Sequence, residues 1–249
     1  MIRSVILPAY NESGYIAEMV RRTVEACERS ADPFEVLVID NASQDDTAAI
    51  VERLAAADGR IRLLRHDTNR LYAGSCLTGV RAARGDHIFI LDSDGQHPPS
   101  DIWKFDAALA SGFDLVFGWR HERAEGPPRL LMSRVLWILA WWYTGFNLHD
   151  VNCGIRGMSR RYADKLDIKH KVNLVNPELY VRARLGGFRM SEVAVVQESR
   201  KAGVSSHELG RLWRIYRTVT TYLKALRAEL RSATRGRKQS GADRAILIL

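Results

Sequence analysis

The stretch HIFILDSDGQHPP, residues 87–99, decides the fold, because an apolar run ends there in two aspartates, Asp92 and Asp94. A short apolar run followed by polar turn residues is typical of a buried strand. In an extended backbone, residues two apart point the same way, with α-carbons about 6–7 Å apart, so the two carboxylates share a face. The pair is repulsive unless a cation lies between its members.

Strand patterns and helical patterns alternate on both sides of this stretch. Apolar runs predict five strands at 4–10, 34–40, 61–66, 87–94 and 114–120. Apolar residues at three- and four-residue spacing predict helices at 15–30, 46–58, 73–85 and 99–112. The alternation predicts an α/β fold, a mostly parallel sheet with helices on both faces. A long aromatic helix from 127, a helix at 176–187, a strand at 190–197 and a basic tail complete the chain.

Composition narrows the class of protein. The chain has 249 residues, 46% of them hydrophobic, and a formal net charge of +8 that is concentrated after Glu198. The basic surface that this segment would form suits nucleic acid, anionic lipid or phosphorylated ligands. No nucleic-acid motif is present, so we expect no nucleic-acid partner. The three cysteines lack disulfide or metal spacing, which indicates core thiols in a reducing compartment.

The apolar runs are too short to act as a leader or to cross a membrane. The first twelve residues are predicted to form a strand rather than a signal sequence. The run VLWILAWWYTGF, residues 135–146, has about half of the roughly 20 residues that a spanning helix needs. This segment can lie on a membrane surface but is not expected to span it.

Polar residues follow four of the predicted strands. They are Tyr10 to Glu12, Asp40 to Ser43, Asp92 to Asp94, and Arg120. Ligands bind at the carboxyl ends of parallel strands, so we expect these clusters to share one site. Each cluster alone is equally well explained as a turn or a helix cap.

The two aspartates indicate a metal site. Carboxylates suit hard cations such as Mg²⁺ or Mn²⁺, and Gln96 can add a neutral oxygen ligand. A cation with open positions can hold a diphosphate and stabilise its charge as a leaving group. Asp-x-Asp by itself is a weak pattern that often marks an ordinary turn.

Several motifs together resemble the family 2 glycosyltransferases with a GT-A fold, and most closely the polyprenyl-phosphate sugar synthases. The motifs are PAYNE (8–12), VIDNASQDDT (38–47), AARGDHIFILDSDGQHPP (82–99), DLVFGWR (114–120) and DVNCGIRGMSR (150–160). The likeness covers about residues 2–206. It implies a catalytic domain over 1–205. The residues that follow predict a basic amphipathic helical extension over 206–235 and a flexible tail over 236–249.

The resemblance also implies roles for individual residues. The nucleotide-sugar pocket would be lined by Pro8, Tyr10, Glu12, Asp40, Ser43, Asp92, Ser93 and Arg120, with Asp40 on the base. The metal would be held by Asp92, Asp94 and Gln96. The donor diphosphate and the acceptor phosphate would be bound by Arg120, Arg129, Ser133, Arg156 and Arg200. The residues expected to be catalytic are Asp92, Asp94, Asp150 and Arg156.

The chain departs from the family pattern in two places. Leu71 and Ala73 stand where the family commonly has glycine, which affects the backbone path near the sugar. The paired C-terminal membrane helices of some members are absent, so we expect peripheral anchoring or a soluble acceptor. Nine apolar residues between Leu209 and Leu226 form a stripe flanked by basic residues. The stripe is typical of an interfacial helix, but also of a helix packed on protein.

The nature of the acceptor decides the mechanism. A sugar hydroxyl needs a general base, whereas a lipid phosphate is already anionic and needs only cations. Asp150 is the candidate base, and it fits equally well as a residue that positions the arginines. The arginines at motif positions favour a phosphate acceptor, because guanidinium groups match phosphate oxygens. We therefore expect an inverting, metal-dependent transfer from a UDP- or GDP-sugar to a polyprenyl phosphate.

Alternatives stay open at this point. In the first alternative the fold and the donor are the same, but the acceptor is a soluble molecule, a peptide or a glycan. In the second, the protein is a non-catalytic scaffold that binds nucleotide sugars. The expected location is cytoplasmic and peripheral, at the cytoplasmic face of the membrane. Homo-oligomerisation, the sugar and the base of the nucleotide are left undecided by the sequence.

Overall fold

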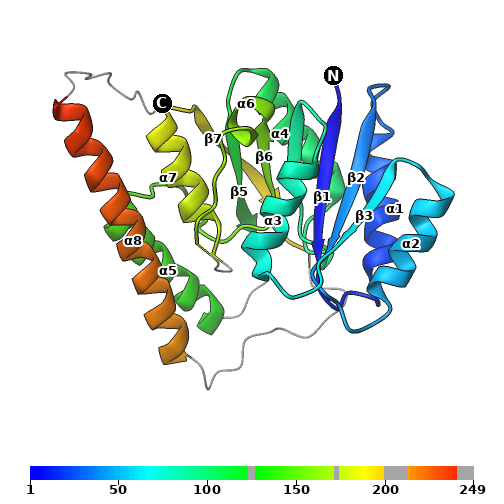
Figure 1. The fold of residues 1–249 in the computed structure, drawn as a ribbon, viewed down its shortest axis with the longest axis horizontal. Coiled ribbons are helices and arrows are strands. Elements are labelled where there is room, and N and C mark those ends of the chain that lie inside the picture. Colours follow the sequence, from blue (N-terminus) through cyan, green and yellow to red (C-terminus); the bar gives the residue numbers. More distant parts are fainter. Residues whose placement is uncertain (123–126, 171–173, 199–211, 240–249) are drawn as a thin grey trace.

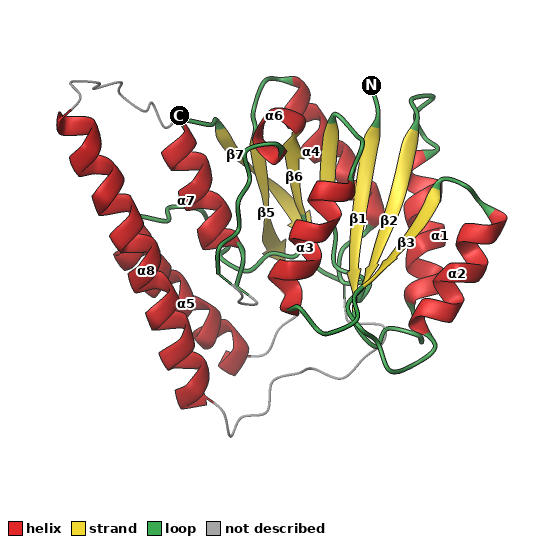
Figure 2. Ribbon diagram, viewed as in Figure 1, coloured by secondary structure: helices red, strands yellow, loops and turns green. Residues whose placement is uncertain are grey.

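A single seven-stranded sheet forms the centre of the molecule (Figures 1 and 2). The computed structural model describes residues 1–122, 127–170, 174–198 and 212–239, and for 122, 127–129, 212–216 and 234–239 it describes the backbone alone. The strands are β1 (Arg3–Ala9), β2 (Phe34–Asp40), β3 (Ile61–Arg65), β4 (His87–Ile90), β5 (Leu115–Glu122), β6 (Arg156–Ser159) and β7 (Met190–Val196). Their order is β3-β2-β1-β4-β6-β5-β7. Only β6 runs antiparallel to its neighbours among these strands.

Helices follow the strands as the sequence predicts. They are α1 (Ile16–Cys27), α2 (Thr47–Ala57), α3 (Leu71–Ala82), α4 (Ile102–Ala110), α5 (Pro127–Thr144), α6 (Arg160–Ala163), α7 (Asn176–Gly186) and α8 (Leu212–Gln239), with a 3₁₀ turn at Pro99–Asp101. The predicted α/β fold is confirmed. The extra strand is β6, whose four residues RGMS carry no strand pattern of their own. It forms because it pairs with β4 on one side and with β5 on the other.

The sheet separates two hydrophobic cores. Ile6 and Ile90 face the core shared with α3, α5, α7 and α8, whereas Val5 and Leu7 face the core shared with α1 and α4. Alternate residues of a strand point to opposite faces, so both faces of the central strands are apolar. All three cysteines are free and buried, and burial raises their pKa to about 12. The predicted core thiols are confirmed.

Helix α8 packs on the domain with the part of its apolar stripe that the structure describes. Tyr222, Leu223 and Leu226 are buried in the core beside α5 and α7. The interfacial interpretation is therefore wrong for these residues, and packing on protein is correct. Leu209 lies outside the described residues. The backbone stays helical through Gln239, so the first four residues of the predicted flexible tail, 236–239, are helical. None of the helices in the described ranges is long and apolar enough to cross a bilayer.

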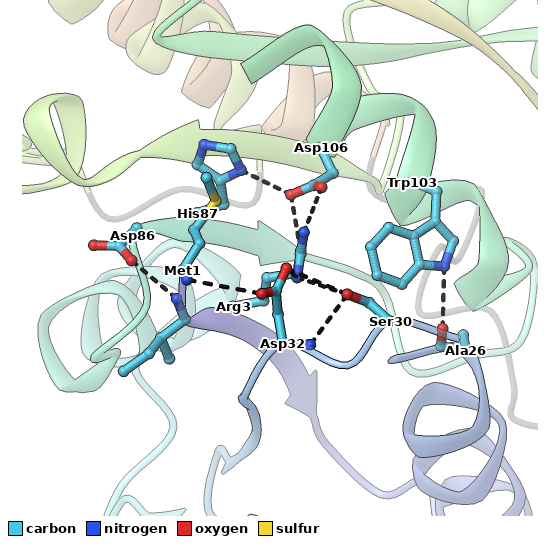
Figure 3. Close-up of polar contacts among 10 residues, drawn as sticks. Met1, Arg3, Ala26, Ser30, Asp32, Asp86, His87, Trp103 and Asp106 are labelled. Carbon is cyan, nitrogen blue, oxygen red and sulfur yellow. Dashed lines mark hydrogen bonds and ion pairs between the residues drawn. The ribbon is translucent and has the colours of Figure 1, made fainter. Parts of the chain in front are cut away.

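A partly buried ion network holds the amino ends of β1 and β4 (Figure 3). Arg3 donates to both oxygens of Asp106, at 3.0 and 2.9 Å, and to Asp32 at 2.7 Å. His87 Nδ1 lies 2.7 Å from Asp106 Oδ1, and the Arg3 guanidinium stacks 4.9 Å from the centre of the Trp103 ring. This network fixes the end of the sheet opposite to the polar strand ends.

Candidate active site

The polar clusters after β1 and β2 are bonded to each other. The backbone N–H of Asn11 donates to Ser43 Oγ at 2.9 Å, and the N–H of Gln44 donates to Asn11 Oδ1 at 2.8 Å. Asn11 and Ala42 have φ of 55° and 63°, in the left-handed region that non-glycine residues seldom occupy. Such strained positions cluster at functional sites, and here both lie at the carboxyl edge of the sheet.

Asp40 ends β2 at a pocket on this edge. Its carboxylate is fully buried; Oδ1 accepts from the N–H of Ser43 at 3.2 Å, and Oδ2 lies 3.4 Å from Arg65 Nε. The pocket beside it is lined by Ala42, Ser43, Arg65, His66 and Asp67. Asp40 is not itself among the lining residues, but it is hydrogen-bonded to one of them, Ser43. A carboxylate can accept a hydrogen bond from the ring N–H of a nucleotide base. The predicted base-binding pair Asp40 and Ser43 is therefore brought together.

The predicted residues after β1 take different environments. Pro8 is buried, and its carbonyl accepts a hydrogen bond from the Ser93 hydroxyl, which ties β1 to the aspartate loop. Glu12 is half-buried, and its N–H donates to Thr47 Oγ1 at 2.9 Å. Tyr10 is exposed to solvent. The structure thus places Pro8 and Ser93 in contact and leaves the Tyr10 ring at the surface.

Asp92 is held by two residues that the sequence did not single out. The Tyr72 hydroxyl donates to Asp92 Oδ1 at 2.5 Å. On the other side, a β-carbon added to Gly154 would lie only 2.0 Å from Asp92 Oδ2. Only glycine leaves room for the carboxylate at this position, so Tyr72 and Gly154 together fix where Asp92 lies.

Asp94 lies in a tight turn directly after Asp92. The N–H of Gln96 donates to Asp94 Oδ1 at 3.1 Å, and Gly95 has a φ of 74° with the Tyr15 ring packed against it. A β-carbon at Gly95 would lie 2.4 Å from that ring, so the turn requires glycine. The turn keeps both aspartates at the carboxyl edge of the sheet.

The donor set of this turn fits Mg²⁺ or Mn²⁺. Asp92, Asp94 and Gln96 offer only oxygen ligands, which hard cations prefer. Within the described ranges no three acidic, histidine or cysteine side chains gather into a metal cluster. A cation held by Asp92 and Asp94 would have two carboxylate ligands and could take further ligands from a substrate. Mg²⁺ is commonly bound in this way, through one or two carboxylates and substrate phosphates.

Arg156 is a buried cation with unused hydrogen-bond donors. It lies at the start of β6, is 3% exposed, and donates from Nη2 to the carbonyl of Cys153 at 2.9 Å. Its guanidinium lies 5.4 Å from the centre of the Tyr72 ring. Nε and Nη1 find no hydrogen-bond acceptor among the described residues. Unsatisfied buried donors are costly, and a guanidinium pairs well with phosphate, so this arrangement is suited to an anionic ligand.

Arg120 and Asp150 form a buried pair. Arg120 donates from Nε and Nη2 to the two oxygens of Asp150, at 2.7 and 3.1 Å, and the N–H of Asn152 also donates to Asp150, at 3.0 Å. Both carboxylate oxygens are thus engaged in hydrogen bonds. This geometry suits Asp150 as a residue that orients Arg120. It suits Asp150 less well as a base that takes a proton from a substrate.

Three further residues predicted to bind phosphate stay predictions. Arg129 lies in α5, where the structure describes the backbone alone, and Arg200 lies outside the described residues. Ser133 is half-buried on α5. Of the missed residues, Gly154 stands in a quoted motif, which was a usable signal, whereas Tyr72 lies just before the predicted helix at 73–85 and no pattern singled it out.

The chain belongs to glycosyl transferase family 2, whose model matches residues 4–167. It is therefore a glycosyltransferase. It is 32% identical over 165 residues to the undecaprenyl-phosphate 4-deoxy-4-formamido-L-arabinose transferase of Pseudomonas fluorescens, covering 66% of this chain and 48% of that protein. To the transferase of the same name from Sodalis glossinidius it is 30% identical over 222 residues, covering 88% and 67%. The chain thus spans about half to two thirds of these relatives.

Solved structures confirm the GT-A fold. The glucosyl-3-phosphoglycerate synthase of Mycobacterium tuberculosis, in complex with Mn²⁺, UDP-glucose and phosphoglyceric acid, matches with a TM-score of 0.69 and 22% identity, over 91% of this chain and 79% of that one. A mannosyltransferase of Pyrobaculum calidifontis, in complex with GDP-Man and Mn²⁺, matches with a TM-score of 0.60 and 19% identity, over 97% and 76%. At this level of identity the likeness shows the fold alone.

Proposed function

We propose that this glycosyltransferase moves a sugar from a UDP- or GDP-sugar to a polyprenyl phosphate, with inversion, while bound peripherally at the cytoplasmic face of a membrane. The observation that carries the proposal is Arg156, a buried guanidinium beside Asp92 with two donor atoms that no described residue accepts. The relatives named for undecaprenyl-phosphate acceptors support the choice of a lipid phosphate. The neighbours with bound nucleotide sugars and Mn²⁺ support the choice of donor.

In this proposal Asp92, Asp94 and Gln96 would hold Mg²⁺ or Mn²⁺ on the donor diphosphate. The cation, when bound, would stabilise the negative charge that develops as the nucleoside diphosphate leaves. Asp40 and Ser43 would bind the base of the nucleotide, with Pro8, Tyr10, Glu12 and Ser93 around the same pocket. Tyr72 and Gly154 would keep the Asp92 carboxylate in place throughout the reaction.

The chemical step would need no general base. An oxygen of the acceptor phosphate attacks the anomeric carbon, and the bond from that carbon to the diphosphate oxygen breaks with its electron pair on the leaving group. Because the acceptor is already an anion near neutral pH, no proton is removed from it. Arg156, and Arg120 oriented by Asp150, would position the phosphate groups. Arg129, Ser133 and Arg200 stay predictions as further phosphate ligands.

The acceptor can be tested directly. The protein is incubated with a panel of UDP- and GDP-sugars, Mn²⁺ or Mg²⁺, and either a polyprenyl phosphate or a pool of soluble acceptors, and products are identified by mass spectrometry. We expect a lipid-linked sugar phosphate with inverted configuration. A product formed only on a soluble acceptor would contradict the proposal.

The role of Arg156 can be tested in the same assay. Arg156→Lys keeps the charge but removes the two-pronged donor, and we expect it to lower kcat/KM by about a hundredfold. Arg160→Lys is the matched control, because Arg160 donates to the carbonyls of Ala83 and Gly85, away from the aspartates. Equal activity of the Arg156→Lys and Arg160→Lys variants would remove the main support for an anion site at Arg156.

A further inference from the structure

Helix α5 exposes a continuous apolar face. Leu131, Val135, Ile138 and Trp142 are exposed by 66%, 44%, 48% and 62%, and their spacing of four, three and four residues places them on one side of the helix. Trp141 adjoins them and is 47% exposed. Exposed apolar stretches of this kind on a soluble domain mark contact surfaces. We call these five residues the α5 apolar face.

The opposite side of α5 is fixed to the domain. Ala140 and Thr144 are buried, and Trp137 Nε1 donates to the carbonyl of Leu148 at 2.6 Å. The helix therefore cannot turn its apolar face inward without breaking this packing. The face is presented by a rigidly held element, and it lies on the other side of the helix from the core.

Helix α8, which packs beside α5, supplies positive charge (Figure 1). Arg217, Lys224 and Arg231 are exposed and follow each other at seven-residue spacing, which places them on one side of α8. The sequence of α5 contains no acidic residue. The single acidic residue of α8, Glu229, is paired with Arg182 and His170.

We propose that the α5 apolar face docks on an anionic lipid surface, with the basic side of α8 against the head groups. The inference rests on the proposed function in one respect, since a polyprenyl phosphate acceptor lies in a membrane. Tryptophan suits the boundary between water and lipid, and a basic helix is attracted to anionic lipid. A second copy of the chain fits less well, because it would bring another strongly basic helix pair toward the first.

Vesicle co-sedimentation tests this surface without donor or acceptor, so the result does not depend on which reaction the enzyme catalyses. The vesicles contain phosphatidylcholine alone or with about one third phosphatidylglycerol. We expect binding to the anionic vesicles, weakened by added salt. Ile138→Ser should weaken binding about tenfold, and more when combined with Trp142→Ser. Ile2→Ser, at a residue exposed by 40% at the amino end of the sheet, should bind like the unchanged protein.

The electrostatic contribution of α8 to vesicle binding is tested by a separate pair of variants. Arg217→Glu on α8 should weaken binding to the anionic vesicles, whereas Arg53→Glu, the same change at an exposed residue of α2, should not. Equal binding by the Ile138→Ser and Ile2→Ser variants would overturn the proposal. So would analytical ultracentrifugation in which Ile138→Ser turns a dimer into a monomer while vesicle binding stays unchanged. In that case the α5 apolar face would be a subunit interface.

Discussion

The Tyr72 hydroxyl donates a 2.5 Å hydrogen bond to Asp92 Oδ1, which joins the start of helix α3 to the carboxylate that follows β4. Burial, with the nearby Asp92 charge, raises the pKa of Tyr72 well above its ordinary value of 10.0. The hydroxyl therefore stays protonated and keeps donating over the whole physiological pH range. The hydrogen bond thus fixes the position of Asp92 Oδ1 relative to helix α3.

Tyr72→Phe removes this donor and keeps the ring under Arg156. Partners that orient a metal ligand are worth about 10- to 100-fold in metal affinity, so we expect Mn²⁺ to bind that much more weakly in the presence of UDP. Calorimetric titration measures the change. Tyr162→Phe is the control, since its hydroxyl donates to the carbonyl of Leu179, and its loss should lower stability by about 1 kcal/mol without changing Mn²⁺ affinity. Unchanged affinity in Tyr72→Phe would contradict a positioning role.

Gly154→Ala should inactivate the enzyme while leaving it folded. The new β-carbon would lie 2.0 Å from Asp92 Oδ2, closer than any real contact, so the carboxylate has to move. We expect kcat/KM to fall by at least about a hundredfold, because small displacements at a reacting centre are costly. Gly59→Ala is the control, since nothing lies within 4 Å of its β-carbon position. Circular dichroism establishes that both variants fold, and full activity of Gly154→Ala would refute the tight fit.

Leu71 carries backbone strain that glycine would relieve. Its φ is 60°, and a left-handed conformation costs a non-glycine residue about 1–2 kcal/mol. Leu71→Gly removes that cost and adds about 0.5–1 kcal/mol of unfolded-state entropy, so stability should stay level or rise slightly. Leu131→Gly, in a normal helical position, should lose about 1 kcal/mol. Urea unfolding compares the two variants, and equal losses would show that Leu71 is not strained.

The network around Asp106 should make stability depend on acid pH (Figure 3). Burial alone would raise the pKa of Asp106, but hydrogen bonds from His87 and Arg3 lower it to about 2. A carboxyl with a lowered folded pKa stabilises fully above its unfolded pKa of about 3.9 and loses that contribution as pH falls toward 2. Asp106→Asn should therefore cost about 2 kcal/mol at pH 7 and flatten the decline between about pH 4 and pH 2.

The control for the acid experiment is Asp164→Asn. Asp164 is 58% exposed, and its ion pair with Arg160 spans 3.5 Å, so its removal should change stability by less than about 1 kcal/mol. Guanidinium unfolding at several pH values measures both variants. Sugar transfer should be unaffected in Asp106→Asn, because the network lies at the opposite end of the sheet from the aspartates. Parallel pH curves for Asp106→Asn and the unchanged protein would contradict the assignment.

The strands and helices of the first 120 residues were predictable because apolar periodicity dictates them locally. Strand β6 was not, since its four residues become a strand only through pairing with β4 and β5. The apolar stripe of α8 was visible, but a stripe does not say whether protein or lipid covers it. Tyr222, Leu223 and Leu226 turned out to pack inward, whereas several apolar side chains of α5, such as Leu131 and Trp142, are exposed.

The site was predictable where its chemistry lies in the motifs, and less so where it depends on packing. Asp92, Asp94 and Asp40 could be picked out because each is a carboxylate at the end of a buried apolar strand, where an unpaired charge is unfavourable. The pairing of Arg120 with Asp150 and the support of Asp92 by Tyr72 could not, since residues from distant segments meet only in the folded chain. The roles of these residues in catalysis stay predictions.

The carbonyl of Cys153 accepts hydrogen bonds from both Arg156 Nη2 and Asn176 Nδ2. A main-chain carbonyl therefore orients the buried guanidinium of Arg156. Replacing the side chain at position 153 would leave this carbonyl in place. An engineer who wants to shift the anion-binding cation has to reshape the loop between Asp150 and Ile155, or change Asn176 at the start of α7. Laboratory evolution toward new acceptors should accordingly accumulate changes in those two segments rather than at Arg156.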